Sequence, residues 1–284
     1  MTGGVDLAAP IGVFDSGVGG LTVLRALRAA LPHESLLYLG DTARLPYGTK
    51  SPETVVRYAE QAARVLTRRG VKLLVIACNT ASAVALDHLA EVFRPLPVVG
   101  VVEPGASAAC RASKSGRIVV LATEGTVRGG AYERAIRARR PDAVVLQVPC
   151  SLFVALAEEG WVAGPIAEAI ARRYLGAPLA ELPGADCLVL GCTHFPVLRA
   201  AISAAAGPQV ELIDSAETTA QAVAAVLASR GIARPPPEAA SALAWTRFLA
   251  TDAPARFARV GAVFFGAAPE SHEEGHHGVE LVDL

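Results

Sequence analysis

The stretch CLVLGCTHFP (187–196) decides how this sequence is interpreted. Its apolar residues follow one another without a polar break, which is typical of a strand covered on both faces in a parallel sheet. Cys192 ends the apolar run, and His194 follows two residues later. Taken alone, this pair is compatible with a nucleophile and its base, half of a metal site, a thiol–disulfide site or core packing.

Further apolar runs of the same kind recur along the chain, and helical patterns lie between most of them. The runs are IGVFD (11–15), LLYLGD (36–41), KLLVIAC (72–78), PVVGVV (97–102), RIVVLAT (117–123), AVVLQVPC (143–150), CLVLGC (187–192) and VELID (210–214). This βαβα alternation predicts an α/β fold with mainly parallel sheets.

Start and stop signals place helices between the strands. Ser51 is the predicted N-cap of one helix, and Gly70 ends it. Ser215 opens another helix, which Gly231 closes. A last helical segment is predicted over residues 245–264.

Composition limits the class of protein. The hydrophobic fraction is 52% of 284 residues, yet no apolar run approaches the roughly 20 residues that cross a bilayer. The formal net charge of -1 gives no reason to expect a nucleic acid or an anionic membrane as partner. Five cysteines without a CxxC pair or a signal-like segment indicate reduced thiols, and hence a cytoplasmic protein.

A second stretch repeats the pattern of the first. IACNTASA (76–83) and LGCTHFPV (190–197) each place a cysteine at the carboxyl end of an apolar strand, with a helix following. Ligands bind at this edge of open α/β sheets, and a helix N-terminus favours a thiolate there. The side chains that follow the two cysteines are short and polar, and they suit a carboxylate ligand: Asn79, Thr80 and Thr193.

The glycine-rich stretch DSGVGG (15–20) also joins a strand to a helix, which is the arrangement of an anion site. It carries neither the GK[ST] of a phosphate-binding loop nor a GxGxxG motif, so a nucleotide is not indicated.

Two thiols at two strand ends suggest a symmetric use on one small ligand. One thiolate, Cys78 or Cys192, takes a proton from a carbon acid while the other thiol returns one to the opposite face. This inverts a stereocentre without a cofactor, provided that neighbouring groups tune both thiols. Asp15, Glu158 and His194 are the candidate tuning groups.

Several motifs together resemble one family, the glutamate racemases, cofactor-independent enzymes of bacterial cell-wall synthesis. The motifs are GVFDSGVGGLTVL, GDTARLPYG, ACNTASA, LATEGTV, GCTHFPVL and IDSAETTA. The resemblance implies two doubly wound α/β domains with a pseudo-twofold related active site between them. The first domain is expected to comprise residues 1–100 and 211–284, and the second residues 101–210.

The resemblance also implies residue roles. Cys78 would act on D-glutamate with help from Asp15, and Cys192 on L-glutamate with help from Glu158 and His194. The substrate's carboxylates and ammonium would be held by Asp15, Ser16, Tyr47, Gly48, Asn79, Thr80, Thr123, Thr126, Thr193 and His194. No cofactor and no metal is expected, glutamate is the expected ligand, and the expected assembly is a homodimer that supplies D-glutamate for peptidoglycan.

Other interpretations remain open from the residues alone. They are a racemase of aspartate or another acidic amino acid, a protein that binds an acidic amino acid without turnover, and a cysteine–histidine hydrolase. A zinc site at Cys192 and His194 lacks the usual ligand spacing, and no lysine stands in a context for pyridoxal phosphate. The remaining cysteines are expected to be core packing: Cys110, Cys150 and Cys187.

Overall fold

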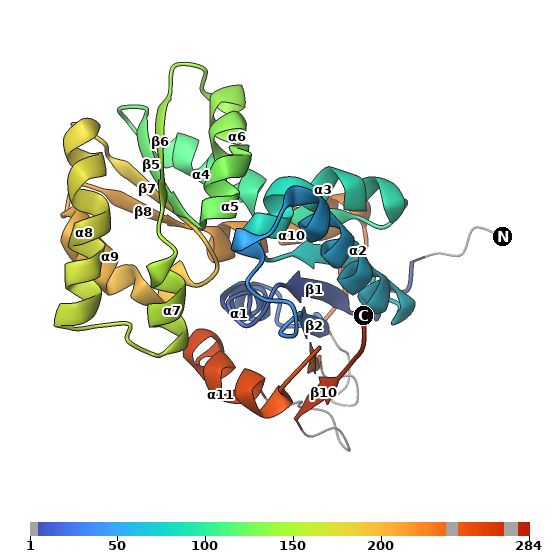
Figure 1. The fold of residues 1–284 in the computed structure, drawn as a ribbon. Helices are drawn as coiled ribbons and strands as arrows, with labels where there is room; N and C mark the ends of the chain where they lie inside the picture. Colours follow the sequence, from blue (N-terminus) through green and yellow to red (C-terminus); the bar gives the residue numbers. More distant parts are fainter. Residues whose placement is uncertain (1–4, 237–243, 270–277) are drawn as a thin grey trace.

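The protein is described by a computed structural model that covers residues 5–236, 244–269 and 278–284. The described residues form two parallel sheets, one of six strands and one of four, with helices packed against them (Figure 1). None of the helices in these ranges is long and apolar enough to cross a membrane.

The first sheet has the strand order β10-β9-β2-β1-β3-β4. Its strands are β1 (Ile11–Asp15), β2 (Leu36–Gly40), β3 (Leu73–Ile76), β4 (Val98–Gly100), β9 (Thr246–Ala250) and β10 (Val279–Leu281). Its helices are α1 (Leu21–Ala30), α2 (Pro52–Arg68), α3 (Asn79–Val92) and α11 (Pro254–Phe265), with a short 3₁₀ turn η1 (Tyr47–Thr49). All five residues of β1 are buried, as the unbroken apolar run IGVFD predicts for a central strand.

The second sheet has the order β6-β5-β7-β8. Its strands are β5 (Arg117–Ala122), β6 (Val144–Pro149), β7 (Cys187–Gly191) and β8 (Glu211–Asp214). The helices around it are α4 (Val102–Ala112), α5 (Glu124–Gly129), α6 (Ala131–Arg139), α7 (Leu152–Glu158), α8 (Pro165–Glu181) and α9 (Arg199–Ala206), with a 3₁₀ turn η2 (Phe195–Leu198). Helix α10 (Ser215–Arg230) packs against α1 and so joins the two halves.

Strand register places the chemistry at one edge of each sheet. In the first sheet Phe14 pairs with Ile76, so Asp15 and Cys78 emerge beside each other. In the second sheet Ala122 pairs with Gly191, which brings the residues after β5 and β7 together in the same way.

The eight predicted strands are confirmed, and so are the signals of α2. Ser51 caps that helix by accepting a hydrogen bond from the Thr54 N–H at 3.3 Å. Gly231 takes a left-handed conformation, φ 64°, after the last turn of α10. Ser215 is the first residue of α10, as predicted, and Asp214 caps the helix, because its carboxylate accepts from the Ala216 N–H at 2.7 Å.

Two predictions are corrected. The segment 245–264 is not one helix, because residues 246–250 form strand β9 beside β2 and only the remainder is helical, as α11. The strand at 211–214, expected beside the strands of the first domain, pairs with β7, Leu212 facing Leu188, and so lies in the second sheet. A division into two domains stays our proposal, with the end of the second domain moved past β8.

Candidate active site

A pocket of about 290 Å³ lies where the carboxyl ends of both sheets meet. Both Cys78 and Cys192 line it, although they follow strands of different sheets. Its other lining residues are Ser16, Leu45, Pro46, Tyr47, Gly48, Thr49, Asn79, Thr80, Thr123, Ser151, Val154, Ala155, Glu158, Thr193 and His194. Of the predicted site residues, Asp15 and Thr126 are not part of the wall; both are completely buried behind it.

Cys78 sits at the N-terminus of α3, where it serves as the helix cap. Its sulfur accepts from the Ala81 N–H at 3.4 Å and donates to the Ser16 hydroxyl at 3.4 Å. Burial, with a further contribution from Asp15, raises the pKa of the Cys78 thiol to about 12. In the empty pocket Cys78 is therefore a protonated thiol, an acid that has a proton to give.

Asp15, the nearest carboxyl group behind Cys78, is completely buried. The glycine-rich loop wraps its carboxylate: Oδ2 accepts from the Gly17 N–H at 2.9 Å, whereas buried Oδ1 has no hydrogen-bond partner among the described residues. Burial raises the pKa of Asp15, while His194 and the loop N–H groups act in the opposite direction. The loop predicted as an anion site thus holds a carboxyl group of the chain itself.

Glycines in this loop also allow the two halves to approach closely. A Cβ on Gly19 would lie 2.3 Å from His194 Nδ1, and one on Gly20 would lie 2.5 Å from Asp15 Cβ. Thr22, just beyond the loop, donates its hydroxyl to the Thr193 carbonyl at 3.0 Å. The loop therefore fits against the segment that carries Cys192.

Cys192 stands at the head of a chain of polar contacts. Its sulfur is 3.8 Å from His194 Nδ1, and His194 Nε2 is 3.3 Å from Glu158 Oε1. Burial alone would lower the pKa of His194, but hydrogen bonds to Cys192 and Glu158 outweigh it and raise that pKa to about 10. At neutral pH a protonated His194 therefore places a positive charge beside the Cys192 sulfur.

The structure places Glu158, and not the adjacent Glu159, beside His194. The hydrogen bond from His194 holds the pKa of Glu158 below its usual value, against the effect of burial. Glu159 is exposed and does not line the pocket.

Polar side chains from both halves meet on another wall. The hydroxyl of Thr80 lies 3.0 Å from that of Thr123 and 3.2 Å from that of Thr126. Asn79 donates its amide to the Tyr132 hydroxyl at 2.8 Å, while its buried Oδ1 has no partner among the described residues. This oxygen is free to accept a hydrogen bond from an ammonium group.

Tyr47 and Gly48 lie in η1, which packs against α5 of the second sheet. The Tyr47 hydroxyl donates to Asp41, so its ring, not its hydroxyl, is offered to the pocket. A Cβ on Gly48 would lie 2.9 Å from Thr123 Cβ, which explains the need for glycine there. The sequence patterns described above did not reveal that the Asp41 carboxylate holds Tyr47.

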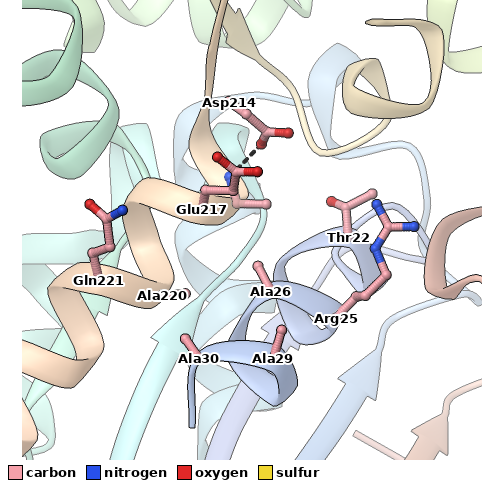
Figure 2. Close-up of a pocket in the computed structure, with 10 residues that line it drawn as sticks. Thr22, Arg25, Ala26, Ala29, Ala30, Asp214, Glu217, Ala220 and Gln221 are labelled. Atoms are coloured by element: carbon pink, nitrogen blue, oxygen red, sulfur yellow. Dashed lines mark hydrogen bonds between the residues drawn. The ribbon is translucent and has the colours of Figure 1, made fainter.

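A larger hollow of about 590 Å³ lies between α1 and α10 and has no such chemistry (Figure 2). Its lining is rich in alanine, and the Thr22 hydroxyl is already engaged with Thr193. Its remaining polar walls are Arg25, Asp214, Glu217 and Gln221. The thiols therefore mark the smaller pocket as the site.

The other thiols contribute to packing, as predicted. Cys150 and Cys187 are buried in two different apolar cores, and partly buried Cys110 packs against the core that contains Cys187. None of the five cysteines forms a disulfide. Over the described ranges, no group of three or more His, Cys, Asp or Glu is placed to hold a metal ion.

Fold and site define a class: an α/β protein with two parallel sheets whose thiols face one small pocket. A family model described as Asp/Glu/Hydantoin racemase matches residues 20–223. The chain belongs to this family of isomerases, and within it to the glutamate racemases.

Individual relatives support this placement over nearly the whole chain. The chain is 51% identical to the glutamate racemase of Geobacter metallireducens over 90% of this chain and 92% of the relative. It is 46% identical to that of Syntrophus aciditrophicus over 97% of both chains. The glutamate racemase of Francisella tularensis, solved in complex with D-glutamate, superposes with a TM-score of 0.87 at 35% identity, covering 98% of each chain.

Proposed function

We propose that the protein interconverts L- and D-glutamate by moving the α-proton between Cys192 and Cys78, with no cofactor. One observation carries the proposal: two thiols from different sheets line the same small pocket. A hydrolase needs one nucleophile and a binding protein needs none, so neither accounts for the second thiol.

The charges around the two thiols suggest how one turnover runs. Cys192, beside a protonated His194, acts as the base and takes the α-proton from L-glutamate. The protonated Cys78 gives its proton to the opposite face of the α-carbon, which yields D-glutamate. Cys192 is left as a thiol and Cys78 as a thiolate, the state from which D-glutamate is converted back.

Substrate binding is proposed to rely on hydroxyl and backbone N–H groups, because no lysine or arginine lines the pocket within the described ranges. Ser16, Thr80, Thr123 and Thr193 supply hydroxyls, and α3 and α5 begin there with free N–H groups. Thr126 holds the other two threonines in place, Asn79 Oδ1 accepts from the ammonium, and Tyr47 and Gly48 close one side. Water-poor surroundings strengthen these contacts as negative charge develops at the α-carbon.

The biological setting also belongs to the proposal. We infer a cytoplasmic enzyme whose product, D-glutamate, enters peptidoglycan, and a homodimer in solution. Sedimentation of the purified protein tests the dimer. Growth of a cell-wall mutant that requires external D-glutamate, with and without this gene, tests the role.

Incubation in deuterated water tests the reaction itself. The protein is mixed with L- or D-glutamate without any cofactor, and optical rotation and α-deuterium are followed, with L-aspartate as a parallel substrate. We expect rotation to decay to zero and deuterium to enter glutamate from either enantiomer. Binding without exchange would support a binding protein instead, and faster exchange of aspartate would assign that acid as the substrate.

A further inference from the structure

Helix α11 belongs to the first half of the molecule but reaches the helpers of Cys192 in the second half. In Figure 1 it extends below α1 toward α7, and α11 and α7 are in contact. The Phe264 ring packs edge-on against the His194 ring, with centroids 5.0 Å apart. Arg256, two turns earlier, lies 3.1 Å from Glu158 Oε2.

These contacts occupy both oxygens of Glu158. Oε1 is 3.3 Å from His194 Nε2, and Oε2 is 3.1 Å from the Arg256 guanidinium. The Glu158 side chain is only 17% exposed, whereas that of Arg256 is 45% exposed. Arg256 is thus the outermost residue in the row of contacts that begins at Cys192. Arg256 is not among the residues that line the pocket, so it has no direct contact with a bound substrate there.

We propose that Arg256 is a positioning residue that acts on the Cys192 thiol by holding Glu158 in place. The role rests on the racemisation proposed above. Without the guanidinium, Glu158 Oε2 is left to water and the carboxylate can rotate away from the imidazole. The charge-assisted contact fixes its direction as well as its charge.

The first test is turnover by Arg256→Ala, with Arg259→Ala as the matched control. Arg259 is exposed on the same helix and forms no hydrogen bond or ion pair with the other described residues. We expect kcat to fall about tenfold in both directions, less than the roughly hundredfold loss that a 1 Å displacement can cause. KM should stay within about twofold, Arg256→Lys should recover most of the loss, and Arg259→Ala should match wild type.

A double-mutant cycle shows whether the effect passes through Glu158. In a Glu158→Gln background, Arg256→Ala should change kcat by less than about twofold, because the partner it orients is already neutral. Equal losses in both backgrounds, or an unchanged kcat in the single variant, would overturn the proposal.

The pH profile separates positioning from simple structural support. Glu158 faces His194 and Arg256, and His194 in turn faces Cys192, Glu158 and Asp15. Since Arg256 helps to keep the pKa of Glu158 low, Arg256→Ala should move the acid limb of kcat to higher pH. A variant that loses only thermal stability, with the acid limb in place, would contradict the role.

A measurement that needs no turnover distinguishes failure of the proposed racemisation from failure of the proposed role of Arg256. If the wild type fails to racemise glutamate, the proposed function falls, but NMR titration of the His194 imidazole still reports on Arg256. A shifted titration in Arg256→Ala and an unshifted one in Arg259→Ala are expected. Identical titrations in both variants would reject the link through Glu158.

Discussion

The end of β3 and the end of β7 carry the same residue in opposite electrostatic settings. Cys78 and Cys192 are each 5% exposed and each follows a central strand. Behind Cys78 lies a carboxyl group, Asp15, with an unpaired oxygen. Beside Cys192 lies an imidazole, His194, backed by a carboxylate.

This difference teaches that sequence symmetry does not imply symmetric charge. Burial and the Asp15 carboxyl group raise the pKa of the Cys78 thiol, whereas a protonated imidazole lies beside the Cys192 sulfur. A proton transfer across a planar intermediate requires one acid and one base, so in the mechanism that we propose this asymmetry sets the direction of the first half-turnover.

Removal of either thiol should cause the largest loss of activity, because each thiol serves a different face of the substrate. Cys78→Ser and Cys192→Ser are each expected to lose at least about a thousandfold in racemisation, within the range of general acid–base effects. The variants should differ in α-hydrogen exchange: in deuterated water, Cys78→Ser exchanges L-glutamate with retention, and Cys192→Ser exchanges D-glutamate. NMR of each enantiomer measures this, and near wild-type turnover in either variant contradicts the two-thiol mechanism.

Replacement of His194 should reduce the electrostatic difference between the two ends. His194→Asn removes the cation beside Cys192, and kcat should fall about a hundredfold. In the wild type kcat/KM should decline as pH rises through about 10, where His194 loses its proton. A pH series of both enzymes checks this, and an alkaline limb that persists unchanged in the variant would show that another group titrates there.

The same residue links pH to stability. Folding raises the pKa of His194 from its usual value of 6.5 to about 10, so between these pH values the folded state holds a proton that the unfolded state releases. The stabilisation is complete below about pH 6.5 and is lost as pH rises through about 10. Urea unfolding from pH 6 to 10 should show this loss in the wild type and a flatter curve in His194→Asn.

Replacement of Asp15 tests the site of Cys78, where we expect turnover to fall and the free energy of unfolding to rise. Its pKa is raised by burial, so its contribution to stability is present below pH 3.8 and is lost as pH rises through the folded-state pKa. At pH 7 the buried carboxylate is therefore unfavourable, and Asp15→Asn should raise the free energy of unfolding by about 1 to 2 kcal/mol. Turnover should fall about tenfold, because one helper of the acid–base pair is lost. A variant both less stable and fully active would refute the assignment.

The strands and the paired thiols could be predicted because their signals are local. Unbroken apolar runs mark buried parallel strands wherever they pair, and a cysteine after such a run falls at the binding edge of its sheet. Because the signals are local, they do not predict which strands pair, and this explains the incorrect placement of one strand. VELID (210–214) identifies a strand, but its choice of sheet depends on pairing with β7, which only the folded chain shows.

The missed parts of the site depend on contacts distant in sequence. Arg256 reaches Glu158 from α11, which follows β9, a strand that pairs with β2 and that we had predicted as part of a helix. Asp41 acquires its role from Tyr47, and Tyr132 from Asn79. Short sequence motifs carry no signal for such partners.

The smallest predicted effect concerns two hydrogen bonds that link the segments after β3 and β7 to the opposite half of the molecule. Asn79, after Cys78, donates to Tyr132 of the second half, and the Thr193 carbonyl, after Cys192, accepts from Thr22 of the first half. Tyr132→Phe leaves the Asn79 amide buried without this acceptor. It should cost about 1 to 3 kcal/mol of unfolding free energy and raise KM severalfold, since the orientation of Asn79 Oδ1 is lost.

Thr22→Val tests the mirror contact and should cost less, about 1 kcal/mol, because a backbone carbonyl keeps its direction without the hydroxyl. Tyr58→Phe serves as control, since the Tyr58 hydroxyl forms no hydrogen bond with the other described residues, whereas its ring packs on Tyr47. Urea unfolding and steady-state kinetics of the three variants decide the matter. If Tyr132→Phe and Tyr58→Phe behave alike, the cross-contact at Asn79 does not position the substrate, and the ends are held together by packing alone.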